Sequence, residues 1–288
     1  MGVPLLTPTT VRTLLADHGL RPRRALGQHF LADPNTARRI VRLAGIGEGD
    51  RVLEIGPGLG SLTLALAEAG ADVVALELDR HLAPVLEGTL AKVGADASRR
   101  RVEVVVGDAL SVDVDALLGD RADGPWHSVS NLPYNVAAPV VARLLETAPR
   151  VERQLVMVQR EVGERLAAGP GSPAYGALSV KVAYHARAEL AGTVPPTVFV
   201  PPPKVESVLV RIVRRPVLPV DVPSSDRLFA LVRAGFGQRR KMLRRSLRPV
   251  LGERVVDVLD AAGVDPAARA ENLELMDWAK VARVEAGL

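Results

Sequence analysis

Four consecutive residues, Asn131, Leu132, Pro133 and Tyr134, carry groups that could hold and orient a nucleobase amine. The Asn131 side-chain oxygen and the Leu132 carbonyl could accept the two N–H bonds of an exocyclic amine, while Pro133 fixes the backbone. The Tyr134 ring could stack on the base, which is worth about 1 to 3 kcal/mol and offsets the few kcal/mol that extruding a base costs. The tetrapeptide therefore has the groups needed to hold a nucleobase by its amino group.

A glycine-rich turn lies upstream, in Glu54-Ile55-Gly56-Pro57-Gly58-Leu59-Gly60. Gly56 and Gly58 would let the backbone approach a ligand and would present amides at the start of the next helix. Glu77 follows at the end of the next expected strand, where a carboxylate could accept both hydroxyls of a ribose. A dinucleotide fingerprint stays possible on spacing alone, because Ser61 is small enough to complete it. A nicotinamide dehydrogenase is therefore an alternative, although it has no use for the tetrapeptide.

Both motifs resemble those of methyltransferases. The glycine turn with Glu54 resembles the first motif of class I S-adenosylmethionine-dependent methyltransferases, and this implies that Asp108 accepts from the adenine amine of the cofactor. The tetrapeptide resembles the (Asn/Asp/Ser)-x-Pro-(Tyr/Phe) signature of enzymes that methylate exocyclic amines of bases. Such a reaction needs no metal and no strong base, because the amine attacks before losing its proton and the sulfonium is a good leaving group. Preorganised geometry would carry the rate.

The elements that must position these residues alternate between strands and helices. Strands are expected at residues 51–55, 72–78, 102–106, 127–131 and 154–158, with helices at 9–18, 34–45 and 62–69 between and before them. Most strands are apolar on both faces, which is typical of a buried parallel sheet. Two more strands, at 178–185 and 204–213, are expected to pair as an antiparallel edge. The pattern predicts a Rossmann-like class I methyltransferase fold, with a mostly parallel seven-stranded sheet.

The chain beyond residue 214 has a different pattern, with helices expected at 226–236, 239–247, 253–262 and 276–286 after a linker-like stretch. We therefore expect a catalytic domain at residues 1–214, which binds S-adenosylmethionine. A small all-α domain that binds RNA is expected at residues 215–288.

Positive charge is concentrated in this second part. The net charge is only +4, but the interval from Arg227 to Arg248 holds eight Arg and Lys residues and no Asp or Glu. Such a block repels itself unless something anionic lies against it. Arg240, Arg244 and Arg248 recur every four residues and so predict one basic stripe along a helix. The alternative is a solvated arginine-rich face. The residues expected to bind RNA are Arg239, Arg240, Lys241, Arg244, Arg245 and Arg248.

Composition excludes several other kinds of site. There is no cysteine, and the five histidines show no metal-ligand spacing, so we expect no bound metal. The N-terminus lacks the charged and apolar regions of a signal peptide, and no apolar run approaches the roughly 18 residues of a membrane span. We expect a soluble cytoplasmic monomer without membrane contact.

Taken together, these residues resemble the KsgA-type small-subunit ribosomal RNA adenine dimethyltransferases, from about Arg23 to beyond Asn272. The segments that carry the resemblance are Leu26–Leu31, Phe199–Val205, Gly235–Lys241 and Arg269–Leu273. The resemblance implies dimethylation of two adjacent adenosines near the 3′ end of 16S ribosomal RNA, within the 30S subunit or its precursor, and a role in small-subunit biogenesis.

The resemblance also implies roles for individual residues. It implies base stacking by Tyr134 and Phe199, and the expected cofactor contacts are His29, Leu31, Gly56, Gly58, Glu77, Asp108 and Asn131. The family usually has Asn where this chain has His29, so a cofactor contact through the backbone would survive the change better than one through the side chain.

Two rivals share much of this pattern. A resistance-type methyltransferase of large-subunit ribosomal RNA would share the fold and the tetrapeptide, but the Pro201-Pro202-Pro203-Lys204-Val205 and Gln238-Arg239-Arg240-Lys241 segments argue against it. A mainly RNA-binding assembly factor on the same scaffold would have no need of intact Asn131, Tyr134, Glu77 and Asp108. An assembly role beside catalysis stays open.

Overall fold

The computed structural model describes residues 5–23, 26–93, 102–119, 121 and 124–287. Within the basic segment 21–31, residues 24 and 25 lie outside this description. The chain forms two compact units, one made of Met1–Gly163 and Glu189–Arg214 and the other of Glu164–Ala188 and Arg215–Leu288. One boundary between the two units falls after Arg214, and residues 164–188 group with the second unit. These residues were expected in the catalytic domain at 1–214.

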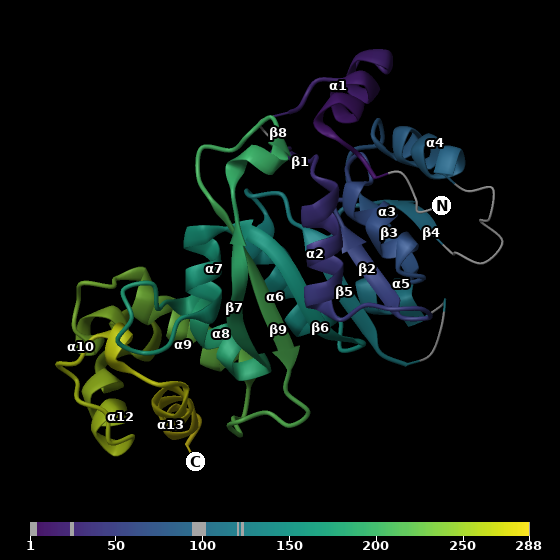
Figure 1. Ribbon diagram of the computed structural model, residues 1–288. Coiled ribbons are helices and arrows are strands. Elements are labelled where there is room, and N and C mark those ends of the chain that lie inside the picture. Colours follow the sequence, from purple (N-terminus) through teal and green to yellow (C-terminus); the bar gives the residue numbers. More distant parts are fainter. Residues whose placement is uncertain (1–4, 24–25, 94–101, 120, 122–123, 288) are drawn as a thin grey trace. The chain divides into compact units, whose positions relative to one another are not determined.

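The first unit is built on a seven-stranded sheet with the order β4-β3-β2-β5-β6-β9-β7. The strands are β2 (Arg51–Ile55), β3 (Asp72–Glu77), β4 (Val102–Val106), β5 (Trp126–Asn131), β6 (Val151–Gln159), β7 (Ala186–Val194) and β9 (Ser207–Arg214). The five strands from β4 to β6 are parallel, and β9 runs antiparallel to β6. The predicted class I methyltransferase fold, with its antiparallel edge, is confirmed (Figure 1).

One predicted strand is wrong. Residues 178–185 lie in a helix, α8 (Ala177–His185), and the edge strand β7 begins only at the next residue. The alternating Val180, Val182 and Tyr184 are typical of a strand, but α8 begins with Ser179 Oγ accepting the Gly176 amide at 3.1 Å. The apolar side chains of α8 pack with those of α9 in one core cluster. Tertiary packing therefore overrides the local pattern.

Three helices of the first unit have bounds close to those expected, namely α1 (Pro8–Asp17), α2 (Pro34–Ala44) and α3 (Ser61–Glu68). The unit also contains α4 (Ala83–Val93), α5 (Val114–Gly119), α6 (Ala137–Thr147) and α7 (Arg160–Ala167), whose last residues belong to the second unit. Asp33 caps α2 by accepting the Thr36 amide at 2.5 Å, and Gly45 ends it with φ 69°. Figure 1 shows α2 and α3 side by side on one face of the sheet.

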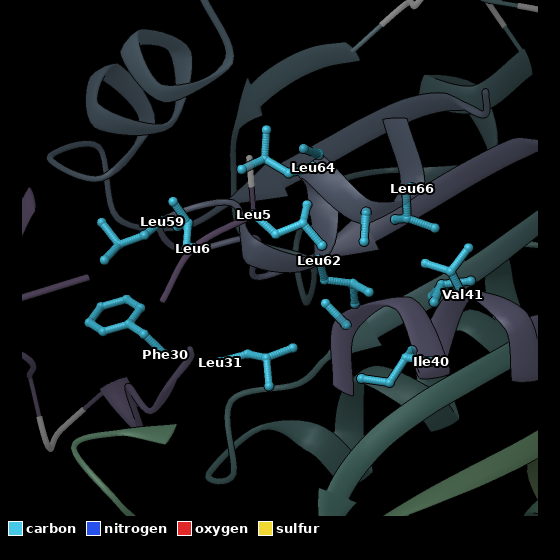
Figure 2. Close-up of a cluster of buried hydrophobic side chains, with 14 of the residues drawn as sticks. Leu5, Leu6, Phe30, Leu31, Ile40, Val41, Leu59, Leu62, Leu64 and Leu66 are labelled. Carbon is cyan, nitrogen blue, oxygen red and sulfur yellow. The ribbon is translucent and has the colours of Figure 1, made fainter. Parts of the chain in front are cut away.

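The main hydrophobic core of this unit lies beneath α2 and α3. Ile40 and Val41 of α2 and Leu62, Leu64 and Leu66 of α3 are buried there (Figure 2). A two-stranded antiparallel ribbon, β1 (Phe30–Leu31) with β8 (Phe199–Val200), adds its apolar side chains to the same cluster. The core therefore anchors the chain segment just before α2, which becomes important at the site below.

The second unit is helical. Besides α8 it contains α9 (Ser225–Gly237), α10 (Leu243–Ser246), α11 (Arg248–Leu251), α12 (Val255–Ala261), α13 (Leu275–Glu285) and the 3-10 turns Gly252–Arg254 and Ala270–Asn272. Its core surrounds Trp278, which is fully buried. Within the described part of the chain, none of the helices is long and apolar enough to cross a membrane.

The helix predicted at 239–247 is wrong. After α9 the chain turns, Met242 is extended, and α10 covers only four residues. The amides of Leu243 and Arg244 donate to the carbonyls of Ala268 (2.8 Å) and Pro266 (3.1 Å) instead of to a preceding helical turn. Arg240, Arg244 and Arg248 consequently lie on three different segments, and the predicted single basic stripe does not form.

Candidate active site

A cavity opens at the carboxyl ends of β2, β3 and β5. Ligands of open parallel sheets bind at this edge, where neighbouring strands connect in opposite directions. The structure brings most of the predicted site residues together around this cavity. They are His29, Leu31, Gly56, Gly58, Glu77, Asn131, Leu132, Pro133 and Tyr134.

The glycine loop has no room for side chains. Gly56 (φ 73°) and Gly58 (φ 59°) both adopt left-handed backbone angles that favour glycine. A Cβ on Gly56 would lie 3.2 Å from Pro133 Cδ, and one on Gly58 would lie 3.0 Å from the Phe30 ring. The loop therefore packs directly against both the tetrapeptide and the segment before α2.

Glu77 ties the end of β3 to this loop. Its Oε2 accepts from the Gly58 amide at 3.0 Å, and its Oε1 accepts from the Asp79 amide at 2.8 Å. Burial raises the pKa of Glu77, while these backbone hydrogen bonds act in the opposite direction. Since a carboxylate offers about four lone-pair sites, Glu77 can still accept hydroxyls of a ligand.

Glu54, at the base of the cavity, is the more unusual acid. Only 1% of it is exposed, and burial raises its pKa to about 8, with the nearby Glu77 adding to the rise and Thr63 opposing it. Its Oε2 has no hydrogen-bond partner among the described residues. At neutral pH this carboxyl is therefore mostly protonated in the ligand-free protein, and it offers a free polar atom to the cavity.

The segment from Leu26 to Leu31 lines one side of the cavity and is held by several contacts. Gln28 Nε2 donates to Asp79 at 3.3 Å, and Arg23 lies 3.5 Å from the same carboxylate. Ser61 Oγ donates to the Leu31 carbonyl. Sequence reasoning missed Asp79 as the anchor of this segment, although its place two residues after Glu77 was a usable signal.

The tetrapeptide follows β5 directly into the cavity wall. Asn131 Nδ2 donates to the His29 carbonyl at 3.2 Å, which fixes the orientation of the amide. The Tyr134 hydroxyl is hydrogen-bonded to Ser207 Oγ at 2.6 Å. The His29 ring stacks on the Tyr134 ring, with centroids 5.3 Å apart and planes 30° apart. Burial raises the pKa of Tyr134, so it remains a neutral phenol.

Two predicted site residues lie elsewhere. Phe199 in β8 is 2% exposed, belongs to the hydrophobic core cluster beneath α2 and α3, and is absent from the described residues that line the cavity. Asp108 follows β4 and also lies outside this lining; its carboxylate accepts from the Leu110 amide at 2.9 Å. The Phe199 ring and the Asp108 carboxylate are therefore not part of the cavity wall, where they were expected from the sequence.

The basic residues of the second unit fall into two groups. Acids from outside the acid-free interval pair with Arg227 (Glu285, 2.7 Å), Arg239 (Glu271, 2.9 Å) and Arg248 (Glu253, 2.6 Å). Internal carboxylates therefore neutralise part of the block without any nucleic acid. The rest are exposed and have no ion pair to any residue that the structure describes. These unpaired cations are Arg233, Arg240, Lys241, Arg244 and Arg245.

The sheet order, the glycine loop and the acid at the end of β3 define a class I methyltransferase. A family model described as "Ribosomal RNA adenine dimethylase" matches residues 19–286, and the chain belongs to this family. It is an rRNA adenine methyltransferase, and its methyl donor is S-adenosylmethionine.

Proteins of similar sequence match this chain over almost its whole length. The chain is 48% identical to a protein of Leifsonia xyli subsp. xyli and 49% identical to one of Thermobifida fusca, each over 96% of this chain and over 98% and 95% of those proteins. Both are named "Ribosomal RNA small subunit methyltransferase A". A dimethyladenosine transferase from Plasmodium falciparum is similar in structure (TM-score 0.71, 25% identity, 88% of this chain and 96% of that one).

The fold alone does not separate methyltransferases of small-subunit RNA from those of large-subunit RNA. The 23S rRNA methyltransferase ErmE is also similar (TM-score 0.63, 27% identity, 88% of this chain and 97% of that one). The relatives of higher identity carry the small-subunit name, so they do not favour the large-subunit alternative.

Proposed function

We propose that this chain methylates the N6 amines of two adjacent adenosines near the 3′ end of 16S ribosomal RNA, giving N6,N6-dimethyladenosines. The substrate is the 30S subunit or its precursor, and the reaction belongs to small-subunit biogenesis. The relatives' names support the subunit. The single structural observation that carries the chemistry is Asn131, whose amide is held by the His29 carbonyl at the rim of the cofactor cavity.

The cavity's own residues fit S-adenosylmethionine. The glycine loop brings backbone amides close to the ligand, and Glu77 has lone pairs left for ribose hydroxyls. The buried, unpartnered Oε2 of Glu54 suits the ammonium of an amino acid end. When bound, the cofactor supplies a methyl group on a positively charged sulfur, which is a good leaving group. Leu31, Asp108 and the backbone of His29 remain proposed contacts, with Asp108 reaching the adenine from beside the cavity.

On the acceptor side, Asn131 and Tyr134 position the adenine. Because Asn131 Nδ2 is used by the His29 carbonyl, its Oδ1 is left to accept an N–H bond of the base. The Leu132 carbonyl takes the second N–H, and Pro133, packed on Gly56, fixes both acceptors. The Tyr134 ring stacks on the extruded base. Stacking is proposed for Tyr134 alone, since Phe199 is buried in the core.

The unpaired cations of the second unit make it the proposed RNA-binding domain. Arg240, Lys241, Arg244 and Arg245 are exposed and free to contact phosphates, whereas Arg239 and Arg248 are held by carboxylates. The protein is proposed to act as a monomer in the cytoplasm, where the small subunit is assembled.

The test is to incubate the protein with undermethylated small subunits and labelled S-adenosylmethionine, and then to map the label. We expect label on two adjacent adenosines near the 3′ end of 16S RNA. Asn131→Ala is expected to lower the rate about 10²- to 10³-fold, as loss of a transition-state hydrogen-bond partner does. Label in large-subunit RNA or DNA would overturn the substrate, and full activity of Asn131→Ala would overturn the mechanism.

A further inference from the structure

His29 contacts both parts of the proposed acceptor site. Its backbone carbonyl accepts from Asn131 Nδ2 at 3.2 Å, and its imidazole stacks on the Tyr134 ring at 5.3 Å. The ring is itself fixed, because His29 Nδ1 lies 2.8 Å from the Pro201 carbonyl oxygen. A carbonyl can only accept, so Nδ1 carries the hydrogen in this contact.

Tyr134 is therefore held at two places. Ser207, which is fully buried, bonds the phenol oxygen at 2.6 Å and fixes the tip of the ring. His29 covers one face and fixes the tilt about the remaining axis. An aromatic platform whose rotation is already restricted loses less entropy when a base stacks on it. Because the His29 ring stacks on one face of Tyr134, an adenine that stacks on this ring must use the opposite face.

We infer that His29 is a positioning residue for the methyl acceptor: its imidazole presets the Tyr134 ring, so that the adenine completes a three-layer stack of imidazole, phenol and base. This rests on the proposed function, in which Tyr134 receives the adenine. It assigns His29 to the acceptor through its side chain, whereas the sequence predicted a cofactor contact at this position. The imidazole itself touches neither the base nor the transferred methyl group.

Two substitutions distinguish the contribution of the His29 ring from that of its hydrogen bond to Pro201. His29→Asn keeps a polar side chain but removes the ring, and His29→Phe keeps a ring but cannot donate to Pro201. Both leave the backbone carbonyl that holds Asn131. An aromatic pair is worth about 0.5 to 1.5 kcal/mol, so we expect His29→Asn to lower kcat/KM for small subunits about two- to tenfold. His29→Phe is expected to recover most of this loss, and the affinity for S-adenosylhomocysteine, measured by calorimetry, is expected to stay unchanged in both.

A second readout needs no substrate. The chain has only three tyrosines, so fluorotyrosine labelling gives three ¹⁹F signals, and Tyr134→Phe identifies the signal of Tyr134. We expect His29→Asn to shift and broaden this signal because ring-current shielding and restricted tilt are lost, whereas His29→Phe keeps it shifted. An unchanged Tyr134 signal in His29→Asn would overturn the inference, as would a loss of cofactor-product affinity that matches the loss of kcat/KM. Failure of the wild type to label small subunits would instead overturn the proposed function, and the ¹⁹F result would still decide the positioning of Tyr134.

Discussion

Glu77 Oε2 accepts a 3.0 Å hydrogen bond from the backbone amide of Gly58, so one carboxylate at the end of β3 fixes the glycine loop of the neighbouring strand. The same carboxylate holds the Asp79 amide, and Asp79 in turn holds Gln28. Three sides of the cavity therefore share one chain of contacts through Glu77. The conformation of the glycine loop is therefore fixed before a cofactor would bind.

Glu77→Gln should weaken cofactor binding strongly. The new amide NH₂ would face one of the two backbone N–H groups, and hydrogen bonds to a charged acceptor are worth about 1.5 to 3 kcal/mol each. We expect the affinity for S-adenosylhomocysteine to fall about ten- to hundredfold in calorimetry. Glu87→Gln, on the exposed face of α4, is the matched control and should bind like the wild type. Equal affinities for the two variants would contradict this role of Glu77.

Two glycines of α9 provide a paired test of packing in the second unit. A Cβ on Gly235 would lie 2.5 Å from Cη2 of the buried Trp278, whereas a Cβ on Gly237 meets nothing within 4 Å. Overpacking a core costs about 1 to 3 kcal/mol, so Gly235→Ala should lower the melting temperature. Gly237→Ala should leave it unchanged or raise it slightly, because alanine favours the helix. Similar melting temperatures would mean that the Trp278 ring has room to move.

The sequence was sufficient to predict those parts of the site that directly follow a recognisable strand. The glycine loop, Glu77 and Asn131 to Tyr134 each follow a recognisable strand, and parallel strands bring their carboxyl ends to one edge. The contacts that join them could not be predicted, because His29 and Tyr134 are brought together by the ribbon of β1 with β8, by the Pro201 carbonyl and by the Asn131 side chain.

The predictions of secondary structure from local sequence patterns were wrong where tertiary contacts oppose those patterns. The alternating valines of α8 favoured a strand, and the arginines at every fourth residue favoured a helix that the Ala268 and Pro266 carbonyls interrupt. Likewise the acid-free interval predicted a large unneutralised charge, but Glu285, Glu271 and Glu253 approach it from elsewhere in the sequence.

The unpaired cations should set the salt dependence of RNA binding. Each phosphate contact contributes about 0.7 to the slope of log K against log salt for single-stranded nucleic acid, so the combined Arg240→Ala, Arg244→Ala and Arg245→Ala variant should flatten the slope by about 2. Cofactor-product affinity should not change. The control removes the same charge at Arg12, Arg42 and Arg254, which are also exposed. The slopes of the two triple variants are measured from the binding of a small-subunit RNA fragment at several salt concentrations. Equal flattening in the two variants would indicate a general charge effect rather than an RNA-binding surface.

The buried carboxyl of Glu54 should make stability depend on pH. Its pKa of about 8 lies above the 4.5 of an ordinary glutamate side chain, so between these values the native state keeps a proton that the unfolded state has released. The contribution of Glu54 is therefore most favourable to folding at acid pH, and it is lost as the pH rises through about 5 to 8. Glu54→Gln keeps the shape but cannot titrate. Relative to that variant, the wild type should lose a few kcal/mol of unfolding free energy across this range, because one pKa unit corresponds to about 1.4 kcal/mol.

Denaturant unfolding of the two proteins at several pH values in that window measures the difference directly, and Glu87→Gln serves again as the exposed control. A constant difference between wild type and Glu54→Gln would mean that Glu54 is charged throughout.

The proton on Glu54 should also be released when the cofactor product binds. If the cofactor's ammonium pairs with Glu54 Oε2, binding of S-adenosylhomocysteine near neutral pH should release close to one proton. Calorimetry in buffers of different ionisation enthalpy counts that proton. Glu54→Gln should release none, and release by both proteins alike would place the ammonium elsewhere.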